Sequence, residues 1–488
     1  MLICPNGLPK WSAQMVCLNS LSSMFGLPEI KKTEHGILIA IWRRSVSNEF
    51  PARLYVEVTT RCNLRCSMCV KQTQGCGIEE ADMPFEVFAR LASCLPHADA
   101  VLLNGVGEPL LHPRLVEMVR FARTHMREEA WVGFQSNGLA LTPRLAADLL
   151  EAGLGTMCLS VDSIASAEME TLHGGGQTAG LARSFAMLRV ARDAATRDAA
   201  TSNESLPGVK PFRIGAEFVI MRRNLHELPH VVCWAAEQGA DYMLASHVLP
   251  YDEQAAAESV FTQDSAETLA FFAEWREKAA AERLDLERYY SLFRKFHRSE
   301  DEKRLVAFVQ EMQQAAAGRG LSLHLKRLIE QHGALPLAEV EEVFAQARSV
   351  AGACGLELHL PAAAAHSERR CDFVEDGAAF ISPDGGVHPC YFLWHRYSCH
   401  LDGQRKIVRP ERFGSITDAP LEAIWRAPEY AKFRKEVCAY EYPDCSACTM
   451  GPCDDMTGEM GAFEHDCHGI TVPCGHCPWC LGGLQCLL

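Results

Sequence analysis

The sequence predicts an α/β protein: a partial (βα)6 TIM-like barrel with a helical insertion and a small cysteine-rich C-terminal domain. Three observations support this fold class. Between residues 51 and 250, short apolar runs alternate with helical patterns, which is typical of a parallel sheet. From 251 to 356 the composition shifts to Ala, Glu, Leu and Arg at helical spacing. Residues 357–488 hold 12 of the 22 cysteines.

The bulk composition excludes several classes of function. A chain of 488 residues is too long for one core, so two or three domains are expected. The net charge of −15 argues against nucleic acid or an anionic membrane as a main partner, and no apolar run approaches a membrane span. Because the N-terminus shows no secretory signal pattern, we expect a cytoplasmic protein. In that reducing compartment, 22 cysteines indicate metal or redox chemistry rather than disulfides.

The elements follow in chain order. Residues 1–50 form an N-terminal extension whose one strand signal is Ile37–Trp42. The expected barrel strands are Leu54–Thr59, Ala100–Leu103, Trp131–Gln135, Met157–Val161, Arg213–Ile220 and Tyr242–Val248. The expected helices, marked by apolar residues at helical spacing, are Pro84–Cys94, Pro113–His125, Pro143–Glu151, Leu181–Ala195 and Leu225–Gln238.

Two connecting segments complete this description. Residues 196–212 are polar and rich in turn residues, so we expect a surface loop there. About four helices are expected in the insertion, followed by a strand at Glu357–Pro361. Parallel connections are right-handed, so six units curl into an open barrel with its active site at the carboxyl ends of the strands.

A cysteine loop follows the first barrel strand. Cys62, Cys66 and Cys69 have the spacing C-x3-C-x2-C. Three thiolates on one short loop can hold three corners of a [4Fe–4S] cluster and leave the fourth iron as an open reaction site. The alternative is a zinc site that recruits Cys76 or His97 as a further ligand.

With this motif the chain resembles the radical S-adenosylmethionine (SAM) enzymes over about Leu54–Leu249. The resemblance implies that the open iron chelates SAM, that one electron from a reduced ferredoxin- or flavodoxin-type donor cleaves it, and that the resulting 5′-deoxyadenosyl radical takes a hydrogen atom from a substrate. Met68 stands where the family often has an aromatic residue near the adenine, and a thioether can form the same apolar wall.

The loop after the second strand contains Gly105, Gly107, Glu108 and Pro109. Its glycines permit a close backbone approach, and its carboxylate could receive an ammonium group. The resemblance implies that this loop contacts the SAM amine, whereas the motif alone would be a turn before a helix.

Further candidate SAM contacts follow the next strands. They are Ser136, Asn137, Ser160, Asp162 and Arg222, with Glu217 as a weaker candidate. These groups suit a ribose or a methionine carboxylate, but an ordinary turn, a helix N-cap or a solvated arginine would use the same residues. The sequence identifies no catalytic acid or base.

The C-terminal cysteines form a second constellation. The spacing Cys371-x13-Gly385-x4-Cys390 and the pair Cys445 and Cys448 resemble the SPASM domain, which binds one or two auxiliary [4Fe–4S] clusters. The candidate ligands are Cys371, Cys390, Cys445, Cys448, Cys453, Cys467, Cys474, Cys477 and Cys486. Cys399 and Cys438 are expected bystanders, Cys480 is left open, and zinc ribbons are the alternative.

The tail from Cys474 to Cys486 is similar to SPASM maturases linked to metalloenzymes, including those beside tungsten aldehyde oxidoreductases. This resemblance implies modification of a peptide, a protein or a cofactor precursor during metalloenzyme maturation. Two alternatives remain open. One is a peptide-modifying or sulfatase-maturase-like enzyme, and the other is a non-catalytic iron–sulfur or zinc protein for electron transfer or binding.

Overall fold

The computed structural model describes residues 29–32, 38–41, 49–73, 76–165, 172, 178–201, 211–292, 295–330, 335–401, 404–445, 448 and 465–487. The chain divides into two compact units, Met1–Asn48 and Glu49–Leu488. In the first unit, β1 (Glu29–Lys32) pairs antiparallel with β2 (Leu38–Ile41), as expected for the strand signal there.

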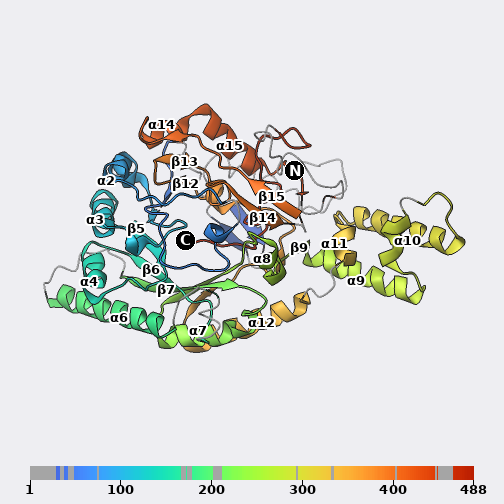
Figure 1. The fold of residues 1–488 in the computed structure, drawn as a ribbon, viewed down its shortest axis with the longest axis horizontal. Coiled ribbons are helices and arrows are strands. Elements are labelled where there is room, and N and C mark those ends of the chain that lie inside the picture. The colour runs from blue at the N-terminus through green and yellow to red at the C-terminus, as the bar shows by residue number, and fades with distance from the viewer. Residues whose placement is uncertain are drawn as a thin grey trace, which may run out of the picture. The chain divides into compact units, whose positions relative to one another are not determined.

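A ten-stranded sheet organises the second unit (Figure 1). Its centre consists of six parallel strands in sequence order, which confirms the predicted strand–helix repeats. These strands are β3 (Arg53–Val56), β4 (Ala100–Leu102), β5 (Trp131–Ser136), β6 (Thr156–Ser160), β7 (Arg213–Ile220) and β8 (Tyr242–His247). Nearly every residue of β4, β6 and β8 is buried, as expected for parallel strands covered on both faces.

Strands from the C-terminal third extend this sheet at both edges. β10 (Glu357–His359) adds to β8 in parallel, as the strand signal there predicts. At the other edge, β12 (Ala378–Ile381) pairs in parallel with β3, and β13 (Gly386–His388) and β16 (Gly414–Ser415) follow antiparallel. The cysteine-rich region therefore continues the barrel sheet.

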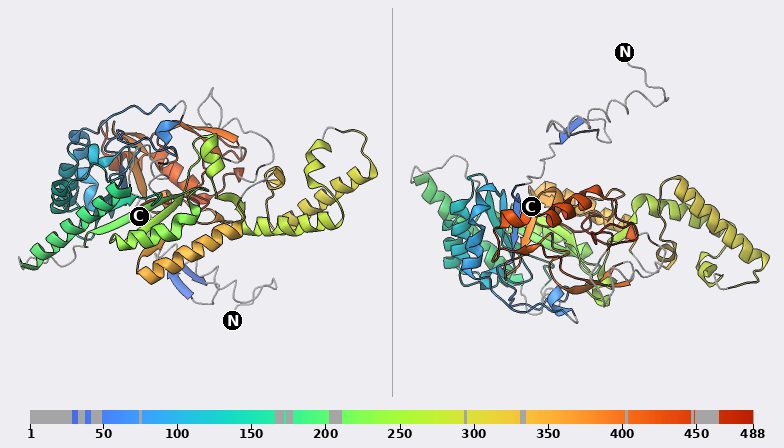
Figure 2. Two further views of the ribbon diagram at one scale, coloured as in Figure 1. Left: turned by 60° about the horizontal axis from the view of Figure 1, so that its bottom comes forward. Right: turned by 90° about the horizontal axis from the view of Figure 1, so that it is seen from above.

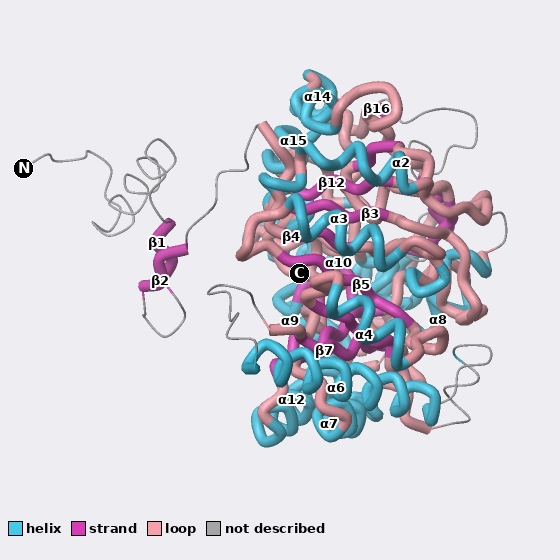
Figure 3. Tube along the Cα trace, turned by 90° about the vertical axis from the view of Figure 1, so that its left-hand side faces the viewer, coloured by secondary structure: helices cyan, strands magenta, loops and turns pink. Residues whose placement is uncertain are grey.

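Helices α3 (Leu115–His125), α4 (Pro143–Glu151) and α6 (Thr178–Thr201) lie along one face of the strands (Figure 3). The predicted helix Pro84–Cys94 is instead one α-helical turn, α2 (Phe85–Phe88), followed by a 3-10 helix (Ala89–Ser93). Pro96 restricts the residue before it, which disfavours a longer α-helix.

The predicted loop 196–212 is wrong in its first part, because α6 continues to Thr201. Its last turns are rich in Ala and Arg, which are strong helix formers. Residues 202–210 lie outside the described residues.

Two groups of helices occupy the predicted insertion. The first follows α8 (Glu253–Glu258) and β9 (Thr262–Ser265). It consists of α9 (Ala266–Ala281), α10 (Glu300–Gly318) and α11 (Leu325–Glu330), which share a core around Trp275, Phe308 and Met312. The second is α12 (Leu337–Cys354), which packs beside α7 (Leu228–Glu237) and leads into β10 (Figure 2). Helix α12 therefore connects back to the sheet, and β10 adds one more parallel strand beside β8.

The C-terminal region adds α13 (Asp372–Glu375), the hairpin β14 (Tyr397–Leu401) and β15 (Gln404–Val408), α14 (Leu421–Arg426) and α15 (Pro428–Ala439). One buried cluster joins Tyr55 and Leu102 of the barrel to Phe380, Phe392 and Trp394 of this region. A short β11 (Ala364–Ala365) pairs with β9. Among the described helices, none combines the length and the apolar character needed to cross a membrane.

Candidate functional site

The cysteine loop leaves the sheet at the carboxyl end of β3. Thr59 fixes its start, because its hydroxyl donates to Asp82 (2.7 Å) and accepts from the backbone N–H of Arg61 (3.0 Å). A tight turn closes it, with the Cys69 N–H donating to the Cys66 carbonyl oxygen (3.0 Å). The loop thus holds its cysteines near the carboxyl ends of the strands, where we expect the active site.

The three thiols of the loop are half-buried neighbours. Burial raises the pKa of Cys62, Cys66 and Cys69, and the other two thiols raise the pKa of Cys66 further. Each thiol must therefore lose its proton when it binds a metal cluster. Three thiols on one short loop match the number of protein ligands of a [4Fe–4S] cluster with one open iron.

The glycine loop after β4 lies directly against the cysteine loop. A Cβ at Gly105 would stand 2.3 Å from Cγ of Glu57, and a Cβ at Gly107 would stand 2.2 Å from the backbone oxygen of Thr59. The Glu108 N–H donates to the Arg61 carbonyl oxygen (2.7 Å). The predicted close backbone approach is therefore confirmed, since only glycine fits at either position.

Glu108 joins the ends of β4 and β5. Its carboxylate accepts from the Leu110 N–H (3.0 Å), the Ser136 hydroxyl (2.7 Å) and the Asn137 N–H (2.8 Å). Burial raises the pKa of Glu108, and these hydrogen bonds oppose the rise. A carboxylate offers about four acceptor positions, so one remains for an ammonium group. Pro109 begins the 3-10 turn that follows.

Ser136 and Asn137, two predicted SAM contacts, therefore meet at Glu108. Asn137 also donates from its side chain to Oδ1 of Asn63 in the cysteine loop (2.8 Å). Their hydrogen bonds make both residues part of the frame that holds the glycine loop against the cysteine loop.

The remaining predicted contacts lie on β6 and beyond. Ser160 is in register with Glu217 of β7. The carboxylate of Asp162 accepts from the Val219 N–H (2.6 Å), and its charge raises the pKa of Cys66. Arg222 donates from Nε to the carbonyl oxygen of Ala257 in α8 (3.3 Å). Asp162 therefore lies near the cysteine loop, while Nε of Arg222 is engaged with α8.

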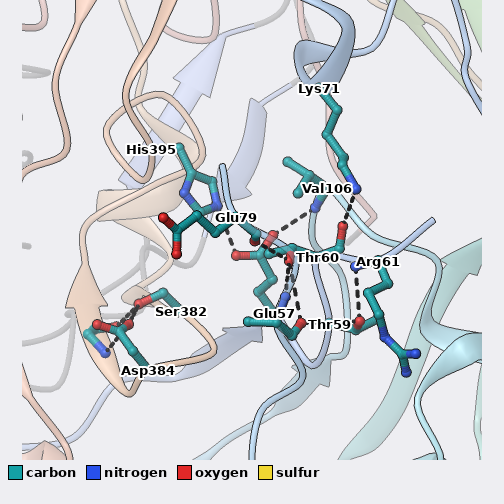
Figure 4. A network of polar contacts seen from close by, with 12 residues as sticks. Glu57, Thr59, Thr60, Arg61, Lys71, Glu79, Val106, Ser382, Asp384 and His395 are labelled. Atoms are coloured by element: carbon teal, nitrogen blue, oxygen red, sulfur yellow. Dashed lines mark hydrogen bonds and ion pairs between the residues drawn. The ribbon is translucent and has the colours of Figure 1, made fainter. Parts of the chain in front are cut away.

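A buried carboxylate that sequence reasoning missed connects the glycine loop to the C-terminal region. Glu57 is fully buried and accepts from the Val106 N–H (2.8 Å) and from Nε2 of His395 (2.8 Å), as Figure 4 shows. A lone Glu in an otherwise apolar strand was its one sequence signal. Because His395 follows Cys390 closely, Glu57 couples the two cysteine regions.

Glu217 is a half-buried carboxylate on β7. Burial raises its pKa to about 8, the charge of Asp162 adds to the rise, and a hydrogen bond with Gln135 opposes it. Glu217 therefore holds a proton near neutral pH, at a position in register with the end of β6.

The C-terminal cysteines gather in one buried group. Its members are Cys371, Cys390, Cys474, Cys477 and Cys480. Cys371 and Cys477 donate to the sulfur of Cys480, and these hydrogen bonds lower its pKa. The Tyr442 hydroxyl donates to the same sulfur (3.6 Å). Cys480, left open by the sequence, therefore lies at the centre of the group.

The other candidate ligands are placed differently. Cys445 lies beside Gly475, where a Cβ would approach its sulfur to 2.5 Å. Cys448 and Cys467 are exposed, and Cys453 lies outside the described residues. Cys486 is half-buried, and its removal from water raises the pKa of its thiol to about 12. Within the described ranges, no three His, Cys, Asp or Glu side chains are grouped so that they could hold a single metal ion.

Of the two expected bystanders, Cys399 is buried in the core that includes the C-terminal region, and Cys438 is exposed on α15. The five buried thiols exceed the four that one cubane cluster uses. This donor set fits an auxiliary cluster.

Comparison with known proteins matches both cysteine regions to families. Residues 56–203 match the radical SAM superfamily, and residues 371–449 match SPASM, an iron–sulfur cluster-binding domain. A protein of Pyrococcus furiosus, described as a tungsten-containing aldehyde ferredoxin oxidoreductase cofactor-modifying protein, is 26% identical over 432 residues. That alignment covers 87% of this chain and 94% of the relative.

Other similarities are more distant or shorter. GTP 3′,8-cyclase of Chlorobaculum tepidum is 35% identical over 114 residues, or 22% of this chain and 32% of the relative. Among solved structures, SuiB of Streptococcus suis bound to the precursor peptide SuiA aligns with a TM-score of 0.42 and 12% identity, covering 89% of this chain and 75% of SuiB.

Proposed function

This chain is a radical SAM enzyme with a C-terminal SPASM domain, and from that premise we propose that it modifies a cofactor precursor or a peptide during the maturation of a metalloenzyme. The observation that carries the proposal is the junction of the two loops after β3 and β4, where Gly107 allows backbone contact with the loop that carries the three thiols. Similarity to a cofactor-modifying protein along most of the chain supports the maturation role. We place this chemistry in the reducing cytoplasm, where thiols stay free.

The residues divide the task as follows. We propose that Cys62, Cys66 and Cys69 hold a [4Fe–4S] cluster with one open iron, which together with SAM supplies reductive cleavage to a 5′-deoxyadenosyl radical. Glu108 would accept the SAM ammonium group at its remaining acceptor position, while Ser136 keeps its carboxylate oriented. The protein thus contributes binding, orientation and exclusion of water.

The buried C-terminal thiols would hold at least one auxiliary cluster. We assign Cys371, Cys390, Cys474 and Cys477 to this cluster as ligands. Cys480, which lies among them, would either replace one of these ligands or hydrogen-bond to them. A reduced ferredoxin or flavodoxin would supply the electron. A peptide substrate and a cofactor-precursor substrate remain the two candidates for the molecule that is modified.

Anaerobic reconstitution tests the enzyme assignment. The protein is loaded with iron and sulfide, mixed with SAM and dithionite, and assayed for 5′-deoxyadenosine. We expect product, with roughly eight to twelve irons per chain for two or three cubane clusters. Cys66→Ala should abolish the product and remove about four irons.

The exposed Cys354 supplies the control, because Cys354→Ser removes a thiol on α12, away from both groups. Its iron content and product should match those of the unaltered protein. Bound zinc without iron, or no SAM cleavage by a fully loaded protein, would overturn the proposal. Assays with candidate precursor peptides and with cofactor precursors then separate the two substrate classes.

A further inference from the structure

A pocket of about 580 Å³ lies where β8 ends, between the insertion and the C-terminal region. Its walls come from α9, the start of α12, the segment Val260–Gln263 and the tail around Gly483. Most lining side chains are apolar, including Phe261, Phe272 and Leu328. This volume and lining are typical of a site for a small organic molecule.

His247, the last residue of β8, lines this pocket and is 2% exposed. Its Nε2 lies 2.9 Å from the carbonyl oxygen of Ala362, which can only accept, so Nε2 carries the hydrogen. Burial lowers the pKa of His247 to about 4, and the ring is therefore neutral. Its Nδ1 is then unprotonated and can only accept a hydrogen bond, and no described group donates to it.

A buried acceptor without a donor destabilises the folded protein, because it has given up its hydrogen bonds to water. Phe261 and Phe344 flank the ring, with centroids 5.2 Å and 6.0 Å from that of His247. A ligand that offers an N–H or O–H group to Nδ1 would remove this cost. His400, which also lines the pocket, likewise leaves Nδ1 without a described donor.

The pocket also has a cation available at its wall. Arg276 of α9 is exposed and forms no ion pair within the described part of the chain. The second arginine of the lining, Arg327, is occupied by Asp264 through two hydrogen bonds of 2.9 Å and 2.7 Å. Arg276 is therefore the group that can meet an anion there.

The walls of the pocket reach both cysteine regions. Val248, in the wall, belongs to the same buried cluster as Leu172 and Met221, against which Met68 of the cysteine loop packs. On the other side, Pro478 lies between the auxiliary-group residues Cys477 and Cys480. The pocket is therefore lined by residues that adjoin elements of both cysteine regions.

We propose that this pocket is a recognition site for an organic anion with an apolar ring body, an N–H or O–H donor directed at Nδ1 of His247, and an acidic group directed at Arg276. The identification of this anion as the substrate, or as a part of the substrate, rests on the proposed function. The binding chemistry itself rests only on the pocket.

Two fluorescent probes of matched shape test the site without SAM or reductant. 8-Anilinonaphthalene-1-sulfonate has the ring body, the N–H and a sulfonate, while N-phenyl-1-naphthylamine has the first two features only. We expect Arg276→Gln to weaken sulfonate-probe binding roughly fivefold to tenfold and to leave the neutral probe unchanged. His247→Phe should weaken both probes to a similar extent, because both lose the hydrogen bond.

The control is Arg304→Gln, an exposed arginine on α10 outside the lining, which should change neither affinity. Circular dichroism establishes whether the His247 variant folds, and Arg276→Gln keeps the test decisive if it does not. Equal effects of Arg276→Gln on both probes, or none on either, would overturn the proposal. Formation of 5′-deoxyadenosine is assayed separately, so loss of the proposed function and loss of this site are distinguished.

Discussion

Replacement of Gly107 by alanine tests the junction of the two loops most directly. The added methyl group would stand 2.2 Å from the Thr59 carbonyl oxygen and 2.7 Å from that of Arg61. Both obstacles are backbone atoms, so the glycine loop must move away as a whole. This movement would break the hydrogen bond from the Glu108 N–H to Arg61 (2.7 Å).

The expected magnitude follows from two contributions. Overpacking of a tight interior costs about 1–3 kcal/mol, and the lost hydrogen bond adds about 0.5–1.5 kcal/mol. We therefore expect the free energy of unfolding to fall by about 1.5–4.5 kcal/mol. Because Glu108 would shift away from the thiols, SAM should also bind at least tenfold more weakly.

Anaerobic urea denaturation and equilibrium dialysis with labelled SAM measure these two effects. The matched control is Gly77→Ala, because a Cβ at Gly77 meets no atom within 4 Å. That variant should keep both values, or gain a few tenths of a kcal/mol from a less flexible unfolded chain. Unchanged stability and unchanged SAM affinity in Gly107→Ala would refute the packing described for these loops.

Three further predictions concern groups in and around the two cysteine regions. Glu57→Gln and His395→Ala should each weaken SAM binding, and a double-mutant cycle should show coupling of about 1–3 kcal/mol; additive effects would mean that the pair does not act as a unit. Cys480→Ala should lower the iron content of the reconstituted protein or alter the cluster's electron paramagnetic resonance spectrum, whereas Cys438→Ala, on an exposed face of α15, should leave both unchanged. For Glu217 the pKa of about 8 in the folded protein lies above the ordinary value of 4.5 for a Glu carboxyl group. The folded state therefore binds the extra proton between these values, and stability should fall as the pH rises through this window. Glu217→Gln should flatten that part of the pH profile of urea midpoints, and an unchanged slope would exclude this titration.

Features with a local signature could be predicted from the amino-acid sequence. Short apolar runs between helical patterns located the six central strands, and α4 has the predicted bounds, since Thr142 caps it and Pro143 begins it. The spacing of Cys62, Cys66 and Cys69 identified the cysteine loop, and the glycines identified the segment that contacts it. These patterns can be recognised in a single sequence because they depend on residues that are close together in the chain.

Tertiary structure alone decided how distant segments meet. No local pattern of residues indicates that β12 pairs with β3, that His395 reaches Glu57, or that Cys480 lies among the other thiols. Each of these contacts joins chain segments whose separation leaves no periodic trace in the sequence. The pocket around His247 belongs to the same class, because its unpaired acceptor exists only once the insertion and the C-terminal tail pack against the end of β8.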